Sequence, residues 1–346
     1  MAHSLSNTLA VIIPCWNCEQ YIGEMLECIH NQTFLEWKAY LVDDGCTDGT
    51  AQIIKDYAQK DSRINYVLRN RGPKGAQTCR NIGFALSEGA EFVVFLDADD
   101  LIAPFCFMQR VCFLQTHPSI DFASFPLKAF KQNIYDDTYW GFGVPGNQEL
   151  LVSLLNWKTL QIVVASNIYR RKSLSSVGVK WDEHLRSMQD ADFNIQSLTK
   201  GLSHLFAEES RIDYFYRQCQ STTVSKRIFD SSMFDSHLCL IEKVVSSIQK
   251  AYHNKYDFYL KAFIVNFFSI FNKNSSPYFS LLRLAFIKKN PVFFCQISLF
   301  LLLGMRGKKR LFKKYVSYST DSARSWSSLV SETIKNRVKA EALYGE

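Results

Sequence analysis

The stretch FVVFLDADD, residues 92–100, joins an apolar run to an acidic run. Five consecutive apolar residues are typical of a strand that is buried on both faces, as in a parallel sheet. The apolar run stops at Asp97-Ala98-Asp99-Asp100. Ligands of open α/β sheets bind outside the carboxyl ends of the strands. This stretch therefore predicts a parallel strand whose end faces a ligand site.

Further strands of this kind lie upstream, with helical segments between them. We expect strands at 9–14, 37–42 and 64–68, and helices at 21–31, 47–59 and 75–87. Strands that alternate with helices predict the α/β class, with an open, mainly parallel central sheet flanked by helices. Polar clusters follow the first two strands, at Trp16-Asn17 and at Asp43-Asp44-Gly45. We expect these clusters and the acidic run to form one site at one edge of the sheet.

The pattern changes after Pro104. We expect helices at 105–115, 149–157 and 190–200, strands at 120–125, 163–170 and 212–217, and a loop at 134–148. From Lys226 onward the chain is helical and apolar in character. The sequence thus predicts an α/β domain over residues 1–225 and a helical, basic C-terminal region over 226–346.

Charge is divided unevenly along the 346-residue chain. Residues 226–346 carry 20 Lys or Arg and 8 Asp or Glu, a net charge of +12, whereas residues 1–225 carry 20 and 25 and have a net charge of −5. The apolar run 292–303 is shorter than the roughly 20 residues that span a bilayer, and six basic residues follow it within 306–314. We expect this region to lie on an anionic membrane surface. The alternative is a helical subdomain that packs on the catalytic domain, and no motif supports a nucleic-acid partner.

The start of the chain and its ten cysteines favour the cytoplasm. Residues 1–14 lack the basic flank and the long apolar stretch of a signal peptide. Scattered cysteines are typical of reduced thiols, and we interpret Cys15-x-x-Cys18 as incidental because no second pair of zinc spacing follows it. We expect a cytoplasmic protein, peripheral on the inner face of the cell membrane.

The residues at the strand ends suggest chemistry with a nucleotide and a metal. Asp97-x-Asp99 can face Mg²⁺ or Mn²⁺, which use one or two carboxylates plus substrate phosphates; the alternative is an acidic turn or a helix cap. A carboxylate of Asp43-Asp44 can accept hydrogen bonds from a base or ribose, or merely organise its turn. Trp16 can stack on a base or belong to the core. Arg80 can bind a phosphate or form a surface ion pair.

Taken in order, these motifs resemble the family 2 inverting glycosyltransferases, over roughly the first 220 residues. The matching segments are VIIPCWN (11–17), VDDGCTD (42–48), GAQTCRNIG (75–83), FLDADD (95–100) and SMQDADF (187–193). The resemblance implies the GT-A fold and a nucleotide-sugar-binding catalytic domain over residues 1–225. By family tendency the donor is a UDP-sugar, and the resemblance also implies a divalent metal, Mn²⁺ or Mg²⁺. It also implies an acceptor that is a lipid-linked sugar or a growing surface polysaccharide. The oligomeric state stays open.

The resemblance assigns roles to the matching positions. It implies that Asp99 ligates the metal and that Asp190 is the general base, which removes the proton of the acceptor hydroxyl as its oxygen attacks the anomeric carbon. Asp192 is the rival for the base role, and a carboxylate favoured by a helix dipole is the alternative for Asp190. The donor would bind Pro14, Trp16, Asn17, Glu19, Asp43, Asp44, Arg80, Asp97 and Ala98. The acceptor would bind Trp181, Glu183, Gln189 and Asp192, although core packing is an equal alternative for this group.

One departure from the family pattern concerns Arg217. The family often has an arginine followed by a histidine near the phosphates, but Gln218-Cys219-Gln220 stand here. This leaves the protein ligands of the metal incomplete. Two other functions stay open: a sugar nucleotidyltransferase, which normally has a Gly-rich loop after the first strand where this chain has Cys15 to Glu19, and a non-catalytic, membrane-associated nucleotide-sugar-binding protein.

Overall fold

The computed structural model describes residues 8–131, 146–155, 163–218 and 233–253, together with the single positions 134, 255, 256, 260 and 263. The chain divides into two compact units. The first comprises residues 1–150 and 161–225, and the second comprises 151–160 and 226–346.

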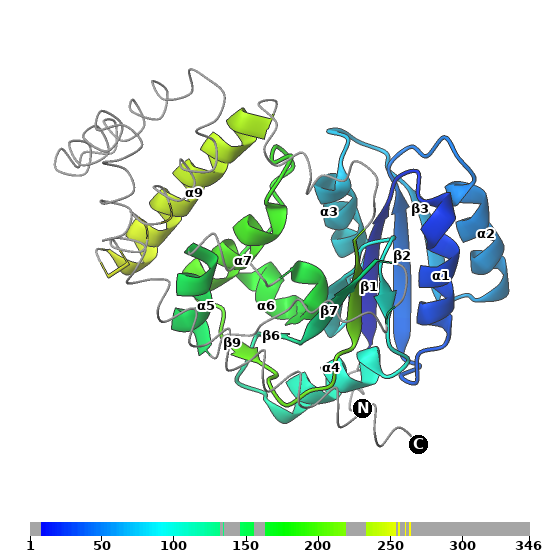
Figure 1. Cartoon of the computed structure of the whole chain (residues 1–346), viewed down its shortest axis with the longest axis horizontal. Helices are drawn as coiled ribbons and strands as arrows, with labels where there is room; N and C mark the ends of the chain where they lie inside the picture. Colours follow the sequence, from blue (N-terminus) through cyan, green and yellow to red (C-terminus); the bar gives the residue numbers. More distant parts are fainter. Residues whose placement is uncertain are drawn as a thin grey trace. The chain divides into compact units, whose positions relative to one another are not determined.

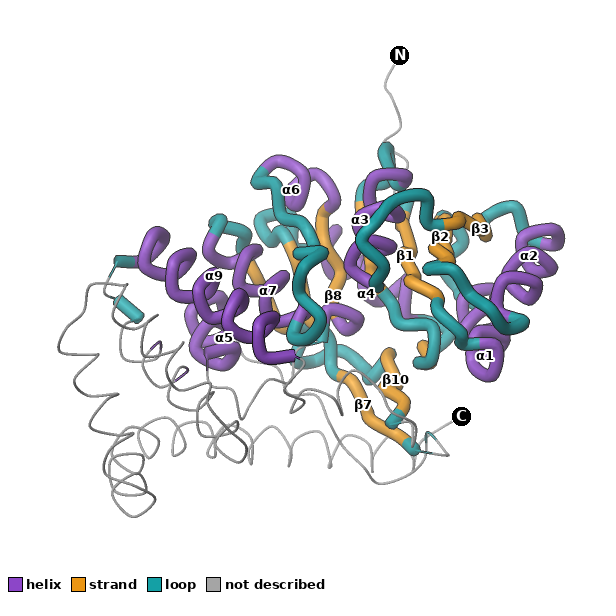
Figure 2. The backbone as a smooth tube through the Cα atoms, turned by 90° about the horizontal axis from the view of Figure 1, so that it is seen from above, coloured by secondary structure: helices purple, strands orange, loops and turns teal. Residues whose placement is uncertain are grey.

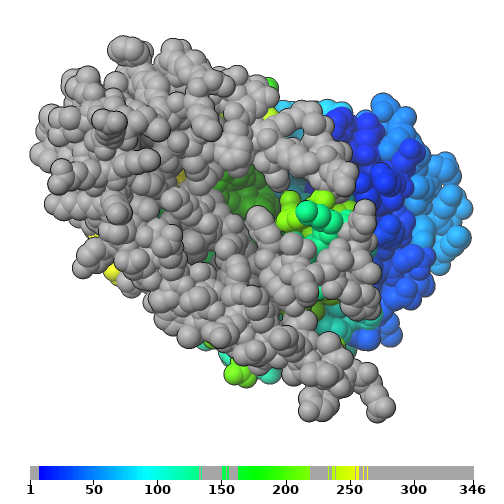
Figure 3. Space-filling view, in the orientation of Figure 1, coloured from blue at the N-terminus to red at the C-terminus, as the bar shows by residue number. Residues whose placement is uncertain are grey.

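The first unit begins with strands that alternate with helices (Figure 1). Their bounds are β1 Leu9–Cys15, α1 Glu19–His30, β2 Trp37–Asp43, α2 Thr50–Lys60, β3 Ile64–Leu68, α3 Ala76–Leu86 and β4 Phe92–Phe95. β1 pairs with both β2 and β4, β2 pairs with β3, and all three pairings are parallel. Helices α1 and α2 contact each other and form the blue part of the surface in Figure 3.

The order of the large sheet is β3-β2-β1-β4-β8-β6-β9. The chain adds β2 and β3 on one side of β1 and then returns to add β4 on the other side. A reversal of this kind opens a crevice at the carboxyl ends of the two central strands. β1 ends next to Trp16 and β4 ends two residues before Asp97, so the topology brings these two residues to the same edge.

The second half of the unit completes the sheet and adds a smaller one. The elements are β5 Leu101–Ile102, α4 Cys106–Thr116, β6 Phe122–Ser124, β7 Leu127–Phe130, the 3-10 turn η2 Val164–Ser166, β8 Asn167–Arg170, α6 Arg171–Ser176, α7 Gln189–Thr199, β9 His204–Phe206 and β10 Tyr214–Arg217. Helix α5, Gly146–Leu155, includes residues of both units. β8 is antiparallel to β4 and to β6. The three-stranded sheet has the order β5-β10-β7, and Figure 2 shows β7 beside β10.

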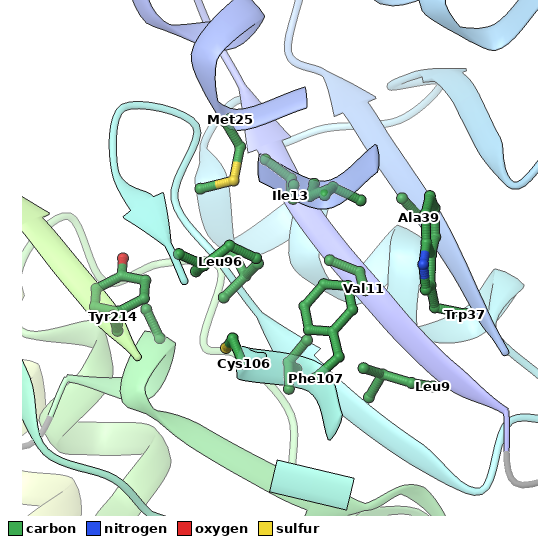
Figure 4. Packing of buried hydrophobic residues seen from close by; sticks show 14 of the residues in the cluster. Leu9, Val11, Ile13, Met25, Trp37, Ala39, Leu96, Cys106, Phe107 and Tyr214 are labelled. Atoms are coloured by element: carbon green, nitrogen blue, oxygen red, sulfur yellow. The ribbon is translucent and has the colours of Figure 1, made fainter. Parts of the chain in front are cut away.

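Both faces of β1 are buried, which explains its continuous apolar sequence. Leu9, Val11 and Ile13 belong to a core cluster that includes Phe107 of α4 (Figure 4). Ile12 lies on the other face, against α3. A Cβ atom at Gly83 of α3 would lie 2.5 Å from the Cγ2 atom of Ile12, so this glycine lets the helix approach the strand closely.

The mainly parallel α/β sheet is confirmed, as are the strands and helices predicted before residue 100. The later predictions need corrections. The strand predicted at 163–170 starts only at Asn167, after a 3-10 turn. The helix predicted at 149–157 begins earlier, at Gly146, and residues 156 and 157 lie outside the described residues. The short elements β5, β7, α6 and β9 were not predicted.

Of the second unit, the described part is mainly the amphipathic helix α9, Phe234–Tyr252. Leu240, Val244 and Ile248 recur at helical spacing and are buried. In the part of the chain that the structure describes, no helix has the length and apolar character needed to cross a membrane. The apolar run 292–303 and the basic residues that follow it lie outside the described residues.

Candidate active site

The acidic run after β4 forms a turn whose last carboxylate is buried. Asp100 is 1% exposed, and its carboxylate accepts hydrogen bonds from the hydroxyl of Tyr214 and from the backbone N–H of Arg217, the latter at 2.7 Å. Burial, followed by the negative charges of Asp99 and Asp97, raises the pKa of Asp100 well above its ordinary value. Asp100 therefore anchors the turn to β10 and does not face a ligand.

Arg80 of α3 connects the two ends of the candidate site. Its Nη2 donates to Asp97 Oδ1 at 2.5 Å, and its Nη1 lies 3.4 Å from Gln189 Oε1. Arg80 is buried, whereas the side chain of Asp97 is 35% exposed. The arginine thus neutralises Asp97 from behind. The sequence left a surface ion pair open as one role for Arg80, and that alternative is wrong, because the arginine of this ion pair is buried.

Asp190, the candidate base, lies in the first turn of α7. Its Oδ2 accepts a hydrogen bond from the N–H of Val164 at 3.3 Å. Burial raises the pKa of Asp190 to about 6; Asp97 also raises it, and Arg80 lowers it. A carboxylate with a pKa near neutrality is suited to accept a proton from a hydroxyl group.

Asp99 is the partly exposed carboxylate between Asp97 and Asp100. Among the described residues, no group of three or more His, Cys, Asp and Glu side chains has the arrangement needed to enclose a metal ion. Mg²⁺ and Mn²⁺ do not need such a cage when substrate phosphates supply further oxygen ligands. The residues present therefore fit an open site with one carboxylate ligand, Asp99, which a bound diphosphate would complete.

Trp16 is suited to stack on a base. Its side chain is 58% exposed at the end of β1, next to the half-buried Pro14, so it does not belong to the core. Lys74 Nζ, from the loop before α3, lies 4.8 Å from the centre of its ring. An exposed indole at the carboxyl end of a central strand provides a flat apolar surface for a nucleobase.

The neighbouring residues Asn17 and Glu19 join two loops. Asn17 Oδ1 accepts the N–H of Thr47 at 2.9 Å, and Glu19 Oε2 accepts the N–H of Gly49 at 2.6 Å. Both contacts tie the loop after β1 to the loop after β2. Asn17 and Glu19 thus help to hold these two loops together, and the donor contacts that we predict for these exposed side chains stay predictions.

The carboxylates after β2 are both buried and have different partners. Asp43 accepts the backbone N–H groups of Gly45 and Cys46 and the hydroxyl of Tyr66, so it organises its own turn. Burial by itself would raise the pKa of Asp43, but hydrogen bonds from Cys46, Tyr66 and the turn lower it below its ordinary value.

Asp44 lies closer to the loop before α3. Its Oδ1 accepts from Arg69 Nε at 2.5 Å and from the N–H of Gly75 at 3.2 Å. Arg69 follows β3 and was not singled out in the sequence analysis, although Arg69, Arg71 and Lys74 lie close together along the chain. Ala98, the remaining residue predicted to contact the donor, is buried in the acidic turn.

The predicted acceptor residues have different surroundings. Trp181 is 3% exposed and stacks on Phe193, with ring centres 4.4 Å apart, which favours core packing over stacking on a sugar. Glu183 accepts two hydrogen bonds from Arg71, at 2.7 and 2.6 Å, which lower its pKa. Asp192 is 2% exposed and accepts from Gln196 at 2.6 Å.

Comparisons with known proteins agree with this geometry. Residues 10–178 match the family model described as "Glycosyl transferase family 2". The poly(ribitol-phosphate) beta-N-acetylglucosaminyltransferase TarS of Staphylococcus aureus (strain Mu50) is 31% identical over 195 residues, which are 54% of this chain and 32% of that protein. The chain therefore spans about a third of the length of TarS. The uncharacterized glycosyltransferase EpsJ of Bacillus subtilis (strain 168) is 25% identical over 72% of this chain and 69% of its own length.

A solved structure shares the fold. The crystal structure of S. aureus TarS 1–349 in complex with UDP-GlcNAc matches with a TM-score of 0.63 and 19% sequence identity, over 90% of this chain and 80% of that one. Residues 10–178, just under half of the chain, form a glycosyltransferase family 2 domain.

Proposed function

We propose that this chain is an inverting glycosyltransferase that moves a sugar from a nucleoside-diphosphate sugar, with UDP as the favoured nucleotide, to a hydroxyl group of the acceptor. The acceptor that we propose is a lipid-linked or growing surface polysaccharide. The observation that carries the proposal is the position of Arg80, which pairs with Asp97, lies 3.4 Å from Gln189 and lowers the pKa of the neighbouring Asp190. Asp97 belongs to the donor end of the site and Asp190 to the end that would hold the acceptor.

An inverting transfer is a single displacement at the anomeric carbon. The acceptor oxygen attacks from the face opposite the diphosphate, so the base and the leaving group must lie on opposite sides of the sugar. Asp190 would take the acceptor proton, and its pKa of about 6 leaves it mostly ionised at neutral pH. Arg80 would hold Asp97 and Gln189 in fixed positions on the two sides.

The donor end needs a surface for the base and a means to neutralise the diphosphate. Trp16 would stack on the base, with Pro14 beside it, and Asp44 would line the same pocket. Asp99 would hold a divalent cation, Mn²⁺ or Mg²⁺. When bound, such a cation neutralises the charge that develops on the leaving diphosphate. That the TarS structure contains UDP-GlcNAc supports a UDP-sugar donor here.

The relatives support a polysaccharide acceptor. TarS is named for poly(ribitol-phosphate), and the minor teichoic acid biosynthesis protein GgaA of Bacillus subtilis (strain 168) is 26% identical over 76% of this chain and 59% of its own length. We also propose a peripheral location on the inner face of the membrane, because residues 226–346 have a net charge of +12. Co-sedimentation with vesicles that contain phosphatidylglycerol, but not with pure phosphatidylcholine vesicles, would support this location. Equal recovery with both would contradict it.

The direct test is a panel of UDP-, GDP- and dTDP-sugars with Mn²⁺, Mg²⁺ or EDTA. We expect slow donor hydrolysis with one nucleotide, dependent on metal, and transfer with inverted anomeric configuration by NMR once an acceptor is found. Asp99→Ala should abolish the metal-dependent reaction while leaving the thermal unfolding midpoint unchanged. Donor binding without hydrolysis or transfer would instead favour a nucleotide-sugar-binding protein, and formation of a sugar nucleotide would favour a nucleotidyltransferase.

The choice of base has its own test. Asp190→Asn should bind donor as the wild type does and lower turnover by about 10³-fold or more, because it removes proton transfer and leaves binding intact. The matched variant is Asp192→Asn, two residues along α7. If Asp192→Asn were the inactive variant and Asp190→Asn the active one, the two assignments would have to be exchanged.

A further inference from the structure

Arg217 at the end of β10 stands where the family often has an arginine near the phosphates, but its contacts in this chain are of another kind. Its Nε donates to the backbone carbonyl of Asp99 at 2.7 Å, and its Nη2 pairs with Glu24 Oε2 of α1 at 2.5 Å. Its own N–H donates to Asp100 Oδ1 at 2.7 Å. The side chain is 11% exposed, whereas that of Glu24 is 54% exposed. The guanidinium is thus bound to the backbone of the acidic turn and to α1.

Two aromatic rings fix the guanidinium further. Its central carbon lies 5.1 Å from the ring centre of Tyr21 and 4.7 Å from that of Phe130. Such contacts restrict the planar group to one orientation, in which one edge faces a carbonyl and the other faces a carboxylate. One side chain therefore joins α1, β10, the strand β7 that contains Phe130, and the acidic turn.

We infer that Arg217 is a positioning residue. Its side chain binds the backbone carbonyl of Asp99 and so fixes the orientation in which the Asp99 carboxylate binds the divalent cation. Arg217 does not itself bind the donor diphosphate. This inference rests on the proposed function. The carboxylates of Asp97, Asp99 and Asp100 repel one another. The turn therefore needs contacts with other elements to keep the Asp99 carboxylate directed toward the metal. The Arg217 side chain donates to the carbonyl of Asp99, and the backbone N–H of Arg217 donates to the carboxylate of Asp100.

The test separates metal affinity from nucleotide affinity in the full chain. Mn²⁺ binding is measured by electron paramagnetic resonance in the presence of saturating UDP, and UDP binding is measured by calorimetry in EDTA. Arg217→Ala should weaken Mn²⁺ binding by about tenfold or more and change UDP affinity in EDTA by less than about twofold. Arg217→Lys should have nearly the same effect, because a lysine keeps the charge but cannot serve the carbonyl and Glu24 together.

Two further variants complete the design. Glu24→Gln, at a more exposed position, should weaken Mn²⁺ binding in the same direction by a smaller factor. Arg211→Ala is the matched control, because Arg211 precedes β10 and its guanidinium carbon lies 4.1 Å from the ring centre of Phe105; both affinities should stay unchanged.

The outcomes distinguish this inference from the function on which it rests. UDP affinity that falls in EDTA with Arg217→Ala and is restored by Arg217→Lys would show a direct phosphate contact and overturn the inference. Unchanged Mn²⁺ affinity in both Arg217 variants would overturn it as well. A wild-type chain that binds neither UDP nor Mn²⁺ would overturn the proposed function, and the inference with it.

Discussion

Arg110 of α4 and Asp213, the residue before β10, form a two-pronged ion pair in which neither side chain is exposed. Arg110 Nη2 lies 2.7 Å from Asp213 Oδ1, and Arg110 Nε lies 3.0 Å from Oδ2. Arg110 Nη1 also donates to the carbonyl of Ala165 at 2.8 Å. The pair thus joins the two segments that support the site, since Val164 donates to the candidate base and Tyr214 to the buried carboxylate of the acidic turn.

Breaking this pair on one side should be strongly destabilising. Asp213→Asn leaves the Arg110 charge buried without a counter-charge, and we expect a loss of about 3–5 kcal/mol in the free energy of unfolding, measured in urea. The control is Arg71→Ala, which removes the ion pair of Arg71 with Glu183. That arginine is 45% exposed, so we expect less than about 1 kcal/mol. Similar losses in the two variants would contradict this view of Arg110.

The activity should depend on pH through Asp190. Its raised pKa means that the ionised, base form is populated above about pH 6, so kcat/KM should fall about tenfold per pH unit below that value. The sign for stability is opposite, because a carboxyl with a raised pKa in the folded state stabilises the protein at low pH and loses this contribution as pH rises through about 6.

Asp190→Asn tests the stability part of this prediction. The variant should be more stable than the wild type at pH 7, by on the order of 1–2 kcal/mol, and the difference should shrink below pH 5. Denaturant unfolding at several pH values measures this difference in stability.

The activity prediction has its own test. A wild type whose kcat/KM stays constant from pH 7 to pH 5 would mean that Asp190 has a lower pKa than described.

Replacement of Arg80 should change the pH profile as well as the rate. The arginine lowers the pKa of Asp190, so Arg80→Gln should move the acidic limb of the kcat/KM profile to higher pH and reduce activity about tenfold or more. Arg171→Gln is the control, because Arg171 contacts the other end of α3 through the carbonyl of Phe84 at 3.0 Å. If the Arg80 variant were slower but its kcat/KM profile kept the same pH dependence, Arg80 would act on Asp97 and the donor and not on Asp190.

Trp16 should contribute to nucleotide affinity without contributing to stability. Stacking of a base on an aromatic ring contributes about 1–3 kcal/mol, so Trp16→Ala should weaken UDP binding tenfold or more in calorimetry, and Trp16→Phe should weaken it less. Because Trp16 is 58% exposed, the free energy of unfolding should hardly change. Leu35→Ala, at a residue 64% exposed between α1 and β2, should change neither quantity. Unchanged UDP affinity in Trp16→Ala would remove this residue from the donor site.

The parallel half of the fold was predictable because its signals are local. A strand buried on both faces must be apolar throughout, so β1 and β4 are visible in the sequence as continuous apolar runs. The short strands β5, β7 and β9 have no such signature. They contain two to four residues and owe their form to pairing with partners that are distant in the sequence, such as β7 with β10.

The sequence by itself determined the alternating sheet, the polar clusters at its strand ends and the resemblance that singled out Asp99 and Asp190. Only the tertiary structure decided which charged groups neutralise one another. Arg80 pairs with Asp97, Arg71 with Glu183 and Arg217 with Glu24, the last across 193 residues of chain. The physical reason is that arginine side chains are long and reach partners on elements that only folding brings together, so a role such as phosphate binding cannot be assigned from sequence position alone.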